Sequence, residues 1–279
     1  MSAKEKILES YKPLIIIPVI VTILALALVA THGLNEGIDL KGGSIATVQL
    51  EKSVSSGELE SLIQSGTGIE DVSVSTSGKQ ATVELGGAAD VVKFTNSVNG
   101  TATILSYRSV GPLLSAQALN QVYWALAFAF IFMSVTVFIV FRKIVPSLAV
   151  ICSAFVDIVV AVGGMSLFGI PLSMASVGAL LMLIGYSVDT DILLTTRVLK
   201  DREGTVNERA AGAFKTGITM TGAAIGAMAA LYVITIVFIP SAKTLSEIAA
   251  VLILGLLADL MATWLMNLGL LKWYMEGHR

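Results

Sequence analysis

Four acidic residues lie inside long apolar stretches of this sequence, where an ionised side chain is costly. Asp157, Asp189, Asp191 and Asp259 each stand among aliphatic neighbours. A carboxylate at the depth of a lipid bilayer costs roughly 2.5–3.5 kcal/mol on insertion scales, so each is a candidate for function. A low dielectric disfavours the charged form, which allows a carboxyl group to be neutral in one conformation and ionised in another. The pattern favours proton binding coupled to movement; the alternative is that these groups only hydrogen-bond one helix to another.

The spacing of the polar residues in one apolar stretch predicts two different roles. Asp189 and Asp191 are two residues apart, so on a helix they point to roughly opposite sides. One faces the interior, and the other packs elsewhere or faces a partner. Gly178 and Gly185 share the helical face of Asp189, which suits packing against another helix. Arg197 lies further along and is either an anchor at the membrane surface or part of the ion pathway.

Composition predicts the elements that must position these residues. The chain has 279 residues, of which 55% are hydrophobic and 14% charged, whereas soluble domains have about 25% charged residues. A net charge of −2 offers no basic field for nucleic acid, and the single Cys152 excludes an intrachain disulfide. We expect no metal site and no cofactor. A bilayer span needs about 20 mostly apolar residues, and six stretches qualify as helices: 14–31, 122–141, 145–168, 173–196, 217–239 and 245–271.

The basic residues predict the orientation of these helices. Lys and Arg gather in the N-terminal tail, in the second and fourth connections and in the C-terminal tail, chiefly at Lys4, Lys6, Lys12, Arg142, Lys143, Lys200, Arg202, Arg209, Lys215, Lys272 and Arg279. The positive-inside rule then places both termini on the cytoplasmic side of the cytoplasmic membrane. The expected units are residues 1–31 (cytoplasmic tail and first helix), 32–121 (extracytoplasmic domain), 122–271 (five-helix bundle) and 272–279 (cytoplasmic tail).

The segment 32–121 reads as a small folded domain. Alternating or extended patterns predict strands over 44–50, 69–76, 81–85 and 101–107, and helices are predicted over 56–65 and 88–98. This β-α-β-β-α-β order is typical of a ferredoxin-like fold. The segment offers no nucleophile paired with a base, so we expect a binding or mechanical module and not an enzyme. The fold class is therefore a polytopic α-helical membrane protein of six helices with an α+β domain between the first two.

A small-residue motif in the fifth apolar stretch suggests close helix packing. Gly222 and Gly226 form a G-x-x-x-G sequence, reinforced by Ala223 and Ala227. Such motifs let two helix backbones approach each other in membranes. We expect this face to pack against another helix of the same chain.

Three segments resemble signatures of the SecF family of protein-export membrane proteins. The stretch Gly37-Ile38-Asp39-Leu40-Lys41-Gly42-Gly43 is similar to the family's G-[IL]-D-x-x-G-G, and Val110-Gly111-Pro112 matches V-G-P. In the fourth helix, Gly185-Tyr186-Ser187-Val188 followed by Arg197 matches G-Y-S-[VI] and its downstream arginine. Bacterial members typically continue N-D-T, where this chain has Asp189, Thr190 and Asp191, and Thr196 stands where they carry a further Asp. The chain looks more like archaeal members.

The resemblance implies a function and a set of partners. Members pair with the related six-span protein SecD in a twelve-span unit of the RND superfamily. This unit assists the SecYE-type translocon in export, using the proton gradient in bacteria, and its outer domains are thought to engage the translocating polypeptide. The implied function is a membrane-embedded accessory subunit of Sec protein export, surrounded by lipid.

Three other functions compete with this interpretation. A small RND-type exporter of lipids or small molecules is the main alternative, and it requires a large apolar cavity between outer domains. An intramembrane aspartyl protease requires Y-D and G-x-G-D contexts, but Tyr186 is followed by Ser187 and Asp259 follows Ala258. A passive scaffold within the translocon, without any ion coupling, is also compatible with the sequence.

Overall fold

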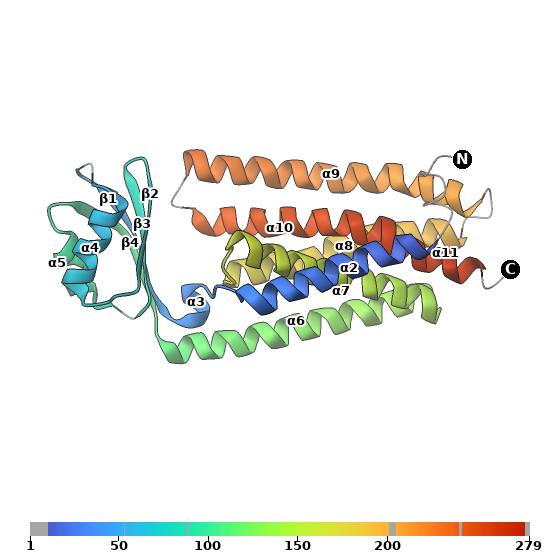
Figure 1. Cartoon of the computed structure of the whole chain (residues 1–279), viewed down its shortest axis with the longest axis horizontal. Coiled ribbons are helices and arrows are strands. Elements are labelled where there is room, and N and C mark those ends of the chain that lie inside the picture. Colours follow the sequence, from blue (N-terminus) through green and yellow to red (C-terminus); the bar gives the residue numbers. More distant parts are fainter. Residues whose placement is uncertain (1–10, 53, 88, 201–204, 240–241, 277–279) are drawn as a thin grey trace.

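The computed structural model describes residues 11–52, 54–87, 89–200, 205–239 and 242–276. A bundle of long helices carries a small sheet domain at one end (Figure 1). The first described helix begins, and the last one ends, at the far end of the bundle (Figure 1). Several residues used above lie outside the described residues: Lys4, Lys6, Ala88 (the predicted start of a helix), Arg202 and Arg279.

The described residues contain six segments long and apolar enough to cross a membrane, which confirms the predicted number. They are α2 (Tyr11–His32), α6 (Pro112–Phe141), α7 (Ile144–Phe168), α8 (Met174–Lys200), α9 (Val206–Phe238) and a last span made of α10 (Lys243–Met261), η1 (Ala262–Asn267) and α11 (Leu268–Glu276). Helix α6 starts at Pro112, well before the predicted Val122. Helix α9 starts at Val206, where Thr205 and Glu208 form a capping box that satisfies two backbone N–H groups. The first turn of α9 is polar, and the first ten residues of α6 mix Leu and Ala with Ser, Gln and Asn, so a hydropathy pattern places both starts too late.

The sheet domain has the predicted ferredoxin-like order. Its elements are β1 (Gly43–Leu50), α4 (Ser56–Thr67), β2 (Val72–Ser77), β3 (Gln80–Leu85), α5 (Val91–Val98) and β4 (Ala102–Val110). The strands form one sheet in the order β2-β3-β1-β4, and every neighbouring pair is antiparallel. Helices α4 and α5 cover one face with Leu59, Ile63 and Phe94, all fully buried. The opposite face is turned towards the membrane bundle (Figure 1).

A short helix joins the first span to the sheet. Helix α3 (Ile38–Lys41) ends at Gly42, whose φ is +82°, and Gly43 follows with a φ of +150°. Both values lie in a region that side chains with a Cβ rarely adopt. A Cβ on Gly43 would also collide with the carbonyl oxygen of Leu85 on the paired strand β3. The Gly-Gly pair therefore lets the chain turn out of α3 and pair with β3 at once.

The helices of the bundle differ sharply in how much they are covered. In α7, α8 and the last span, about half of the residues of the most apolar stretch are buried. In α6 and α9 few of the corresponding residues are buried. Helix α8 contacts α6, α7, α9 and α10, and α6 and α9 lie along opposite sides of the bundle (Figure 1). The interior of the bundle is therefore built around α7, α8 and α10.

Replacing Gly43 by alanine should destabilise the sheet domain by about 1–3 kcal/mol, because it combines an unfavourable φ with a backbone collision. Gly57, in the first turn of α4, is the matched control, since a Cβ there would meet no atom within 4 Å. Gly57→Ala should be neutral or stabilising by up to about 1 kcal/mol through helix propensity. Hydrogen exchange of the β1 and β3 amides in the full chain measures both effects. Equal protection in the two variants would contradict this account of Gly43.

Candidate functional site

Three of the four carboxylates predicted within the membrane meet inside the bundle. Asp157 comes from α7, Asp191 from α8 and Asp259 from α10, and each is fully buried. None of the three forms an ion pair within the described part of the chain. Burying a carboxylate without a cation is costly unless hydrogen bonds compensate for the lost water. The surrounding hydroxyl and amide groups are therefore part of the site.

Asp259 is held by two threonines. Thr190 Oγ1 of α8 lies 2.9 Å from Asp259 Oδ1 and 3.2 Å from Oδ2. Thr263 Oγ1, one turn further along the same span, donates to Asp259 Oδ1 at 2.9 Å. These contacts join α8 to the last span at the depth of the site.

The other two carboxylates each have one partner and one oxygen left over. Ser187 Oγ donates to Asp157 Oδ2, and Asn267 Nδ2 donates to Asp191 Oδ1 at 2.8 Å. Asp157 Oδ1 and Asp191 Oδ2 are buried without a hydrogen-bond partner. Such orphaned buried oxygens are rare in folded proteins and call for an explanation. The site has unused capacity to accept a hydrogen bond or to bind a proton.

Apolar side chains flank the site on both sides along the bundle. Towards the sheet domain, Leu180 and Leu183 of α8 pack with Leu252 of α10. Towards the far end, Leu194 of α8 packs with Trp264 and Leu268 of the last span. The carboxylates therefore lie in the protein interior between two apolar clusters.

Asp189 and Arg197 lie elsewhere. Both are exposed on the outer face of α8, whereas Asp191 points inward, as their spacing predicts. Tyr186 is 44% exposed on the same face. A Cβ on Gly178 or Gly185 would meet no atom within 4 Å. We call the surface formed by Gly178, Gly185, Asp189 and Arg197 the open polar face of α8. It packs against no other part of the described chain.

The prediction that Gly222 and Gly226 pack within the chain is wrong. A Cβ at either glycine would meet nothing within 4 Å. Helix α9 instead turns Ala213, Gly217 and Thr221 inward, and Gly217 fits against the ring of Trp264. Helix α9 packs only along the face that meets α8 and α10, and the G-x-x-x-G sequence lies out of phase with that face.

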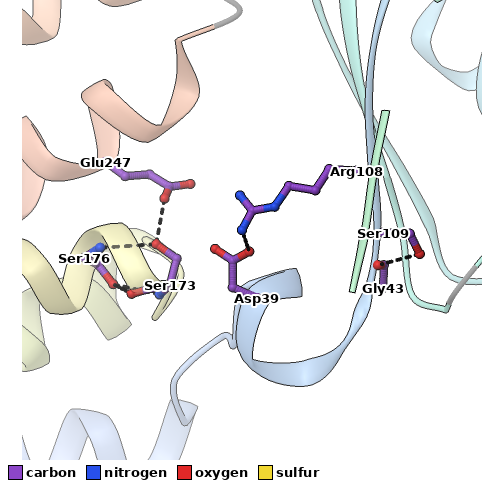
Figure 2. A network of polar contacts seen from close by, with 7 residues as sticks. All are labelled: Asp39, Gly43, Arg108, Ser109, Ser173, Ser176 and Glu247. Atoms are coloured by element: carbon purple, nitrogen blue, oxygen red, sulfur yellow. Dashed lines mark hydrogen bonds and ion pairs between the residues drawn. The ribbon is translucent and has the colours of Figure 1, made fainter. Parts of the chain in front are cut away.

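The motif around Asp39 and the Gly-Gly pair builds the junction between sheet and bundle (Figure 2). Asp39 of α3 forms an ion pair of 2.9 Å with Arg108 of β4. Gly37 N donates to the carbonyl of Leu172, and Leu172 N donates to the carbonyl of Asn35, at 2.8 and 2.7 Å. These contacts tie the segment before α3 to the segment before α8. Ile38 lies in α3 itself, and Val110, Gly111 and Pro112 form the direct connection from β4 to α6.

Helices α8 and α10 are also joined where they begin. Ser173 Oγ, just before α8, donates to Glu247 Oε2 of α10 at 2.9 Å (Figure 2). Lys243, the first residue of α10, forms an ion pair with Glu84 of β3. The two helices that carry Asp191 and Asp259 therefore start at the junction with the sheet domain.

Comparison with known proteins assigns the chain to a family. A family model described as protein export membrane protein SecD/SecF, C-terminal, matches residues 90–277. The chain belongs to the SecD/SecF family. A second model, the SecD/SecF GG motif, matches residues 27–54, which include α3 and its Gly-Gly pair. The resemblance drawn from the three short motifs is thus confirmed.

Named relatives in this family cover the whole chain. The protein-export membrane protein SecF of Methanothermobacter thermautotrophicus is 64% identical over 98% of this chain and 95% of its own length. The SecF of Methanocaldococcus jannaschii is 40% identical over 98% of both chains. The SecD/SecF family member described here is therefore a multi-pass membrane protein and an accessory component of Sec-dependent protein export.

Solved structures show the same fold in a longer chain. The crystal structure of SecDF, a translocon-associated membrane protein from Thermus thermophilus, matches with a TM-score of 0.80 at 18% identity. The match covers 96% of this chain and 38% of that chain, so this member spans well under half of the SecDF polypeptide. SecDF in its super-membrane-facing form matches with a TM-score of 0.55 at 17% identity.

Sequence reasoning missed the residues that satisfy the carboxylates. Thr263 and Asn267 were not singled out, and Ser187 and Thr190 were named only as parts of a motif. One signal was available, because Asp259, Thr263 and Asn267 recur every four residues in an otherwise apolar span. Among the described residues, no three His, Cys, Asp or Glu side chains converge as metal ligands would.

Thr263→Val should lower the thermal stability of the detergent-solubilised protein by about 1–3 kcal/mol, because it removes a donor from a buried carboxylate. Thr219→Val is the matched control, since Thr219 is exposed on α9 and bonds only to the carbonyl of its own helix at Lys215. The control should change stability by less than about 0.5 kcal/mol. Similar melting temperatures for both variants would show that Thr263 does not support Asp259.

Proposed function

We propose that this SecD/SecF family member couples proton movement across the membrane to protein export, using the buried group of Asp157, Asp191 and Asp259. The observation that carries the proposal is the burial of three carboxylates that form no ion pair with any described residue. Three adjacent negative charges in a low dielectric repel each other and lose their hydration. The group is therefore most stable when protons are bound, and releasing them requires the surroundings to change.

The hydrogen-bond pattern supports a proton as the coupling ion. Thr190 Oγ1 lies 2.9 Å from Asp259 Oδ1 and also 2.9 Å from the carbonyl oxygen of Ser187. A hydroxyl has one hydrogen to donate. When it donates to the carbonyl, which only accepts, the contact with Asp259 needs a proton on the carboxyl group. The geometry thus suits a carboxyl group that gains and loses a proton in place.

The apolar clusters make proton binding depend on conformation. In this structure, apolar clusters around Leu183 and Leu194 lie on both sides of the group along the bundle. On this proposal, protons reach Asp191 and Asp259 when α8 and the last span separate or rotate. A ligand shifts a conformational equilibrium only if it binds the states unequally, and a group that is sealed in one state and open in another meets this condition.

We further propose that SecD covers the open polar face of α8. Asp189 and Arg197 would otherwise face lipid from within a candidate membrane span, which is unfavourable for charged groups. Gly222 and Gly226 on the neighbouring α9 leave a second surface for close helix approach. The longer SecDF chain contains polypeptide beyond the part matched here, and a separate SecD subunit is the natural equivalent.

The remaining partners follow from the orientation predicted by the basic residues. Both termini then lie in the cytoplasm, and the sheet domain lies outside, where a translocating polypeptide leaves the SecYE-type channel. The sheet domain acts as a mechanical or binding module without catalysis of its own.

An apolar groove of about 310 Å³ among α2, α7 and α10 offers a surface for lipid chains. Because this groove lies in the bundle, it does not favour the alternative of an exporter with a cavity between outer domains.

Replacing Asp191 or Asp259 by asparagine should reduce proton flux through vesicles containing the complex with SecD at least tenfold, because the titrating group is lost. The same variants should slow export in cells. Glu70→Gln, on the exposed surface of the sheet domain, is the control and should leave both rates within twofold. Wild-type flux and export in both variants would refute proton coupling and favour a passive scaffold.

Adding bulk to the open polar face of α8 should weaken pairing with SecD. Gly185→Leu should reduce at least fivefold the SecD recovered on purification from native membranes, because the helix backbones can no longer approach closely. Ala27→Leu adds bulk to an exposed position of α2 and should leave recovery unchanged. If wild-type protein is recovered only as a homodimer, without SecD or translocon subunits, the pairing proposal fails.

A further inference from the structure

The last span contacts α8 through two side chains that an α-helix would not point in the same direction. Asp259 meets Thr190, and Asn267 meets Asp191. Asp259 and Asn267 are eight residues apart, which in an α-helix leaves them about 80° apart around the axis, near the two edges of one face. An ideal α-helix that turned Asp259 directly towards α8 would therefore turn Asn267 about 80° away from that direction.

The segment between these two residues is not an α-helix. Residues Ala262–Asn267 form η1, a π-helix that continues directly from α10 and into α11. A π-helix bonds residue i to residue i+5, so each residue turns less around the axis than in an α-helix. The π-helix therefore reduces the angle around the helix axis between Asp259 and Asn267. Both side chains then lie on the face that meets α8.

The surroundings of η1 hold the wide turn but leave hydrogen-bonding groups unused. Trp264 is packed edge-on against Phe214 of α9 at 5.0 Å between ring centres, and Gly217 fits beside it. Yet Trp264 Nε1 and Asn267 Oδ1 are buried without a partner. Wide turns of this kind are frequent at functional sites. The segment thus combines firm packing on the α9 side with unsatisfied polar atoms near the carboxylates.

We propose that Asn267 is a positioning residue of the carboxylate group, and that the π-helical turn of η1 is what presents its amide to Asp191. Closing η1 to an α-helix would rotate Asn267 by up to one residue's turn, about 100°, and detach it from Asp191. The π-helical conformation of η1 therefore determines whether the amide of Asn267 can donate a hydrogen bond to Asp191. The proposal rests on the proposed function only in that Asp191 is taken as a coupling group.

Cysteine crosslinking tests the geometry without measuring transport. Asn267 Nδ2 also lies 3.3 Å from Thr195 Oγ1 of α8, and Cys152→Ser removes the single native cysteine. In that background, Thr195→Cys should form a disulfide with a cysteine at 267 at least fivefold faster than with one at 266 or 268. Faster crosslinking at 266 or 268 would overturn the proposal, because the turn would not be in the inferred register.

Deletion of Met266 should convert η1 to an α-helix and still leave Asn267 on the face that meets α8, because seven residues then separate it from Asp259 and an α-helix leaves the two about 20° apart. The Thr195→Cys and Asn267→Cys pair should therefore keep its crosslink, as should Leu183→Cys and Gly255→Cys, which report a close α8–α10 contact above the site. Loss of the first crosslink with the second one kept would refute the role of η1. If both are lost, the chain has not folded, and the comparison of positions 266, 267 and 268 in the undeleted chain decides.

Transport then tests whether Asn267 acts through Asp191. With SecD in vesicles, Asn267→Ala should reduce proton flux about tenfold, and Met266→Ala should stay within twofold. Combining Asn267→Ala with Asp191→Asn should cost no more than Asp191→Asn alone, because both remove the same interaction. Multiplied losses would overturn the positioning role. Normal flux in Asp191→Asn itself would instead refute the proposed function, while the crosslinking result would still decide the geometry of η1.

Discussion

Three carboxylates share the interior of this helical bundle without an ion pair to any residue that the structure describes, and the packing of the bundle must compensate for their burial. Each must receive hydrogen bonds from neighbouring helices, since lipid supplies none. Ser187 and Thr190 of α8 reach Asp157 and Asp259, and Asn267 reaches Asp191. The polar contacts run between helices, so they fix the register of α7, α8 and the last span against one another.

The same helices connect this polar interior to the sheet domain. Helices α8 and α10 are joined at their first turns by Ser173 and Glu247, and Lys243 ties α10 to Glu84 of β3. The segment before α3 is tied to the segment before α8 through backbone hydrogen bonds at Leu172. A change in how α8 and α10 pack at the carboxylates therefore acts on helices whose other ends contact the sheet. The Gly-Gly pair belongs to this junction for a steric reason, because only glycine fits at Gly43.

The exposed surfaces of α8 and α9 carry residues that are unusual for contact with lipid. A helix that is hydrophobic on all sides is stable in lipid. Helix α8, however, exposes Asp189 and Arg197, and α9 exposes Gly222 and Gly226, which pack against nothing in the described chain. Charged and small residues on a lipid-facing surface indicate helix contact. These are the surfaces on which we propose that SecD packs.

Much of this protein could be read from its sequence, because the strongest signals are local. Six apolar stretches fix the spans, since bilayer thickness sets helix length. Alternation and turn residues around Ser77-Gly78-Lys79 fix the strands of the sheet domain. The two-residue spacing of Asp189 and Asp191 separates an inward from an outward carboxylate through helix geometry alone. Helices α6 and α9 start before the predicted residues because their first turns, of mixed polarity in α6 and polar in α9, give a weak hydropathy signal.

Tertiary structure decided what those residues meet. Nothing in the spacing of Asp157, Asp191 and Asp259 says that they converge, because the distance between helices depends on packing far along the chain. The G-x-x-x-G of α9 shows the same limit: the motif permits close approach, but the fit of Gly217 against Trp264 determines which face is used. The π-helical turn before Asn267 is the clearest case. The π-helix is stabilised by contacts with α8 and α9. These helices lie far away in the sequence, so a local sequence pattern does not predict the π-helix.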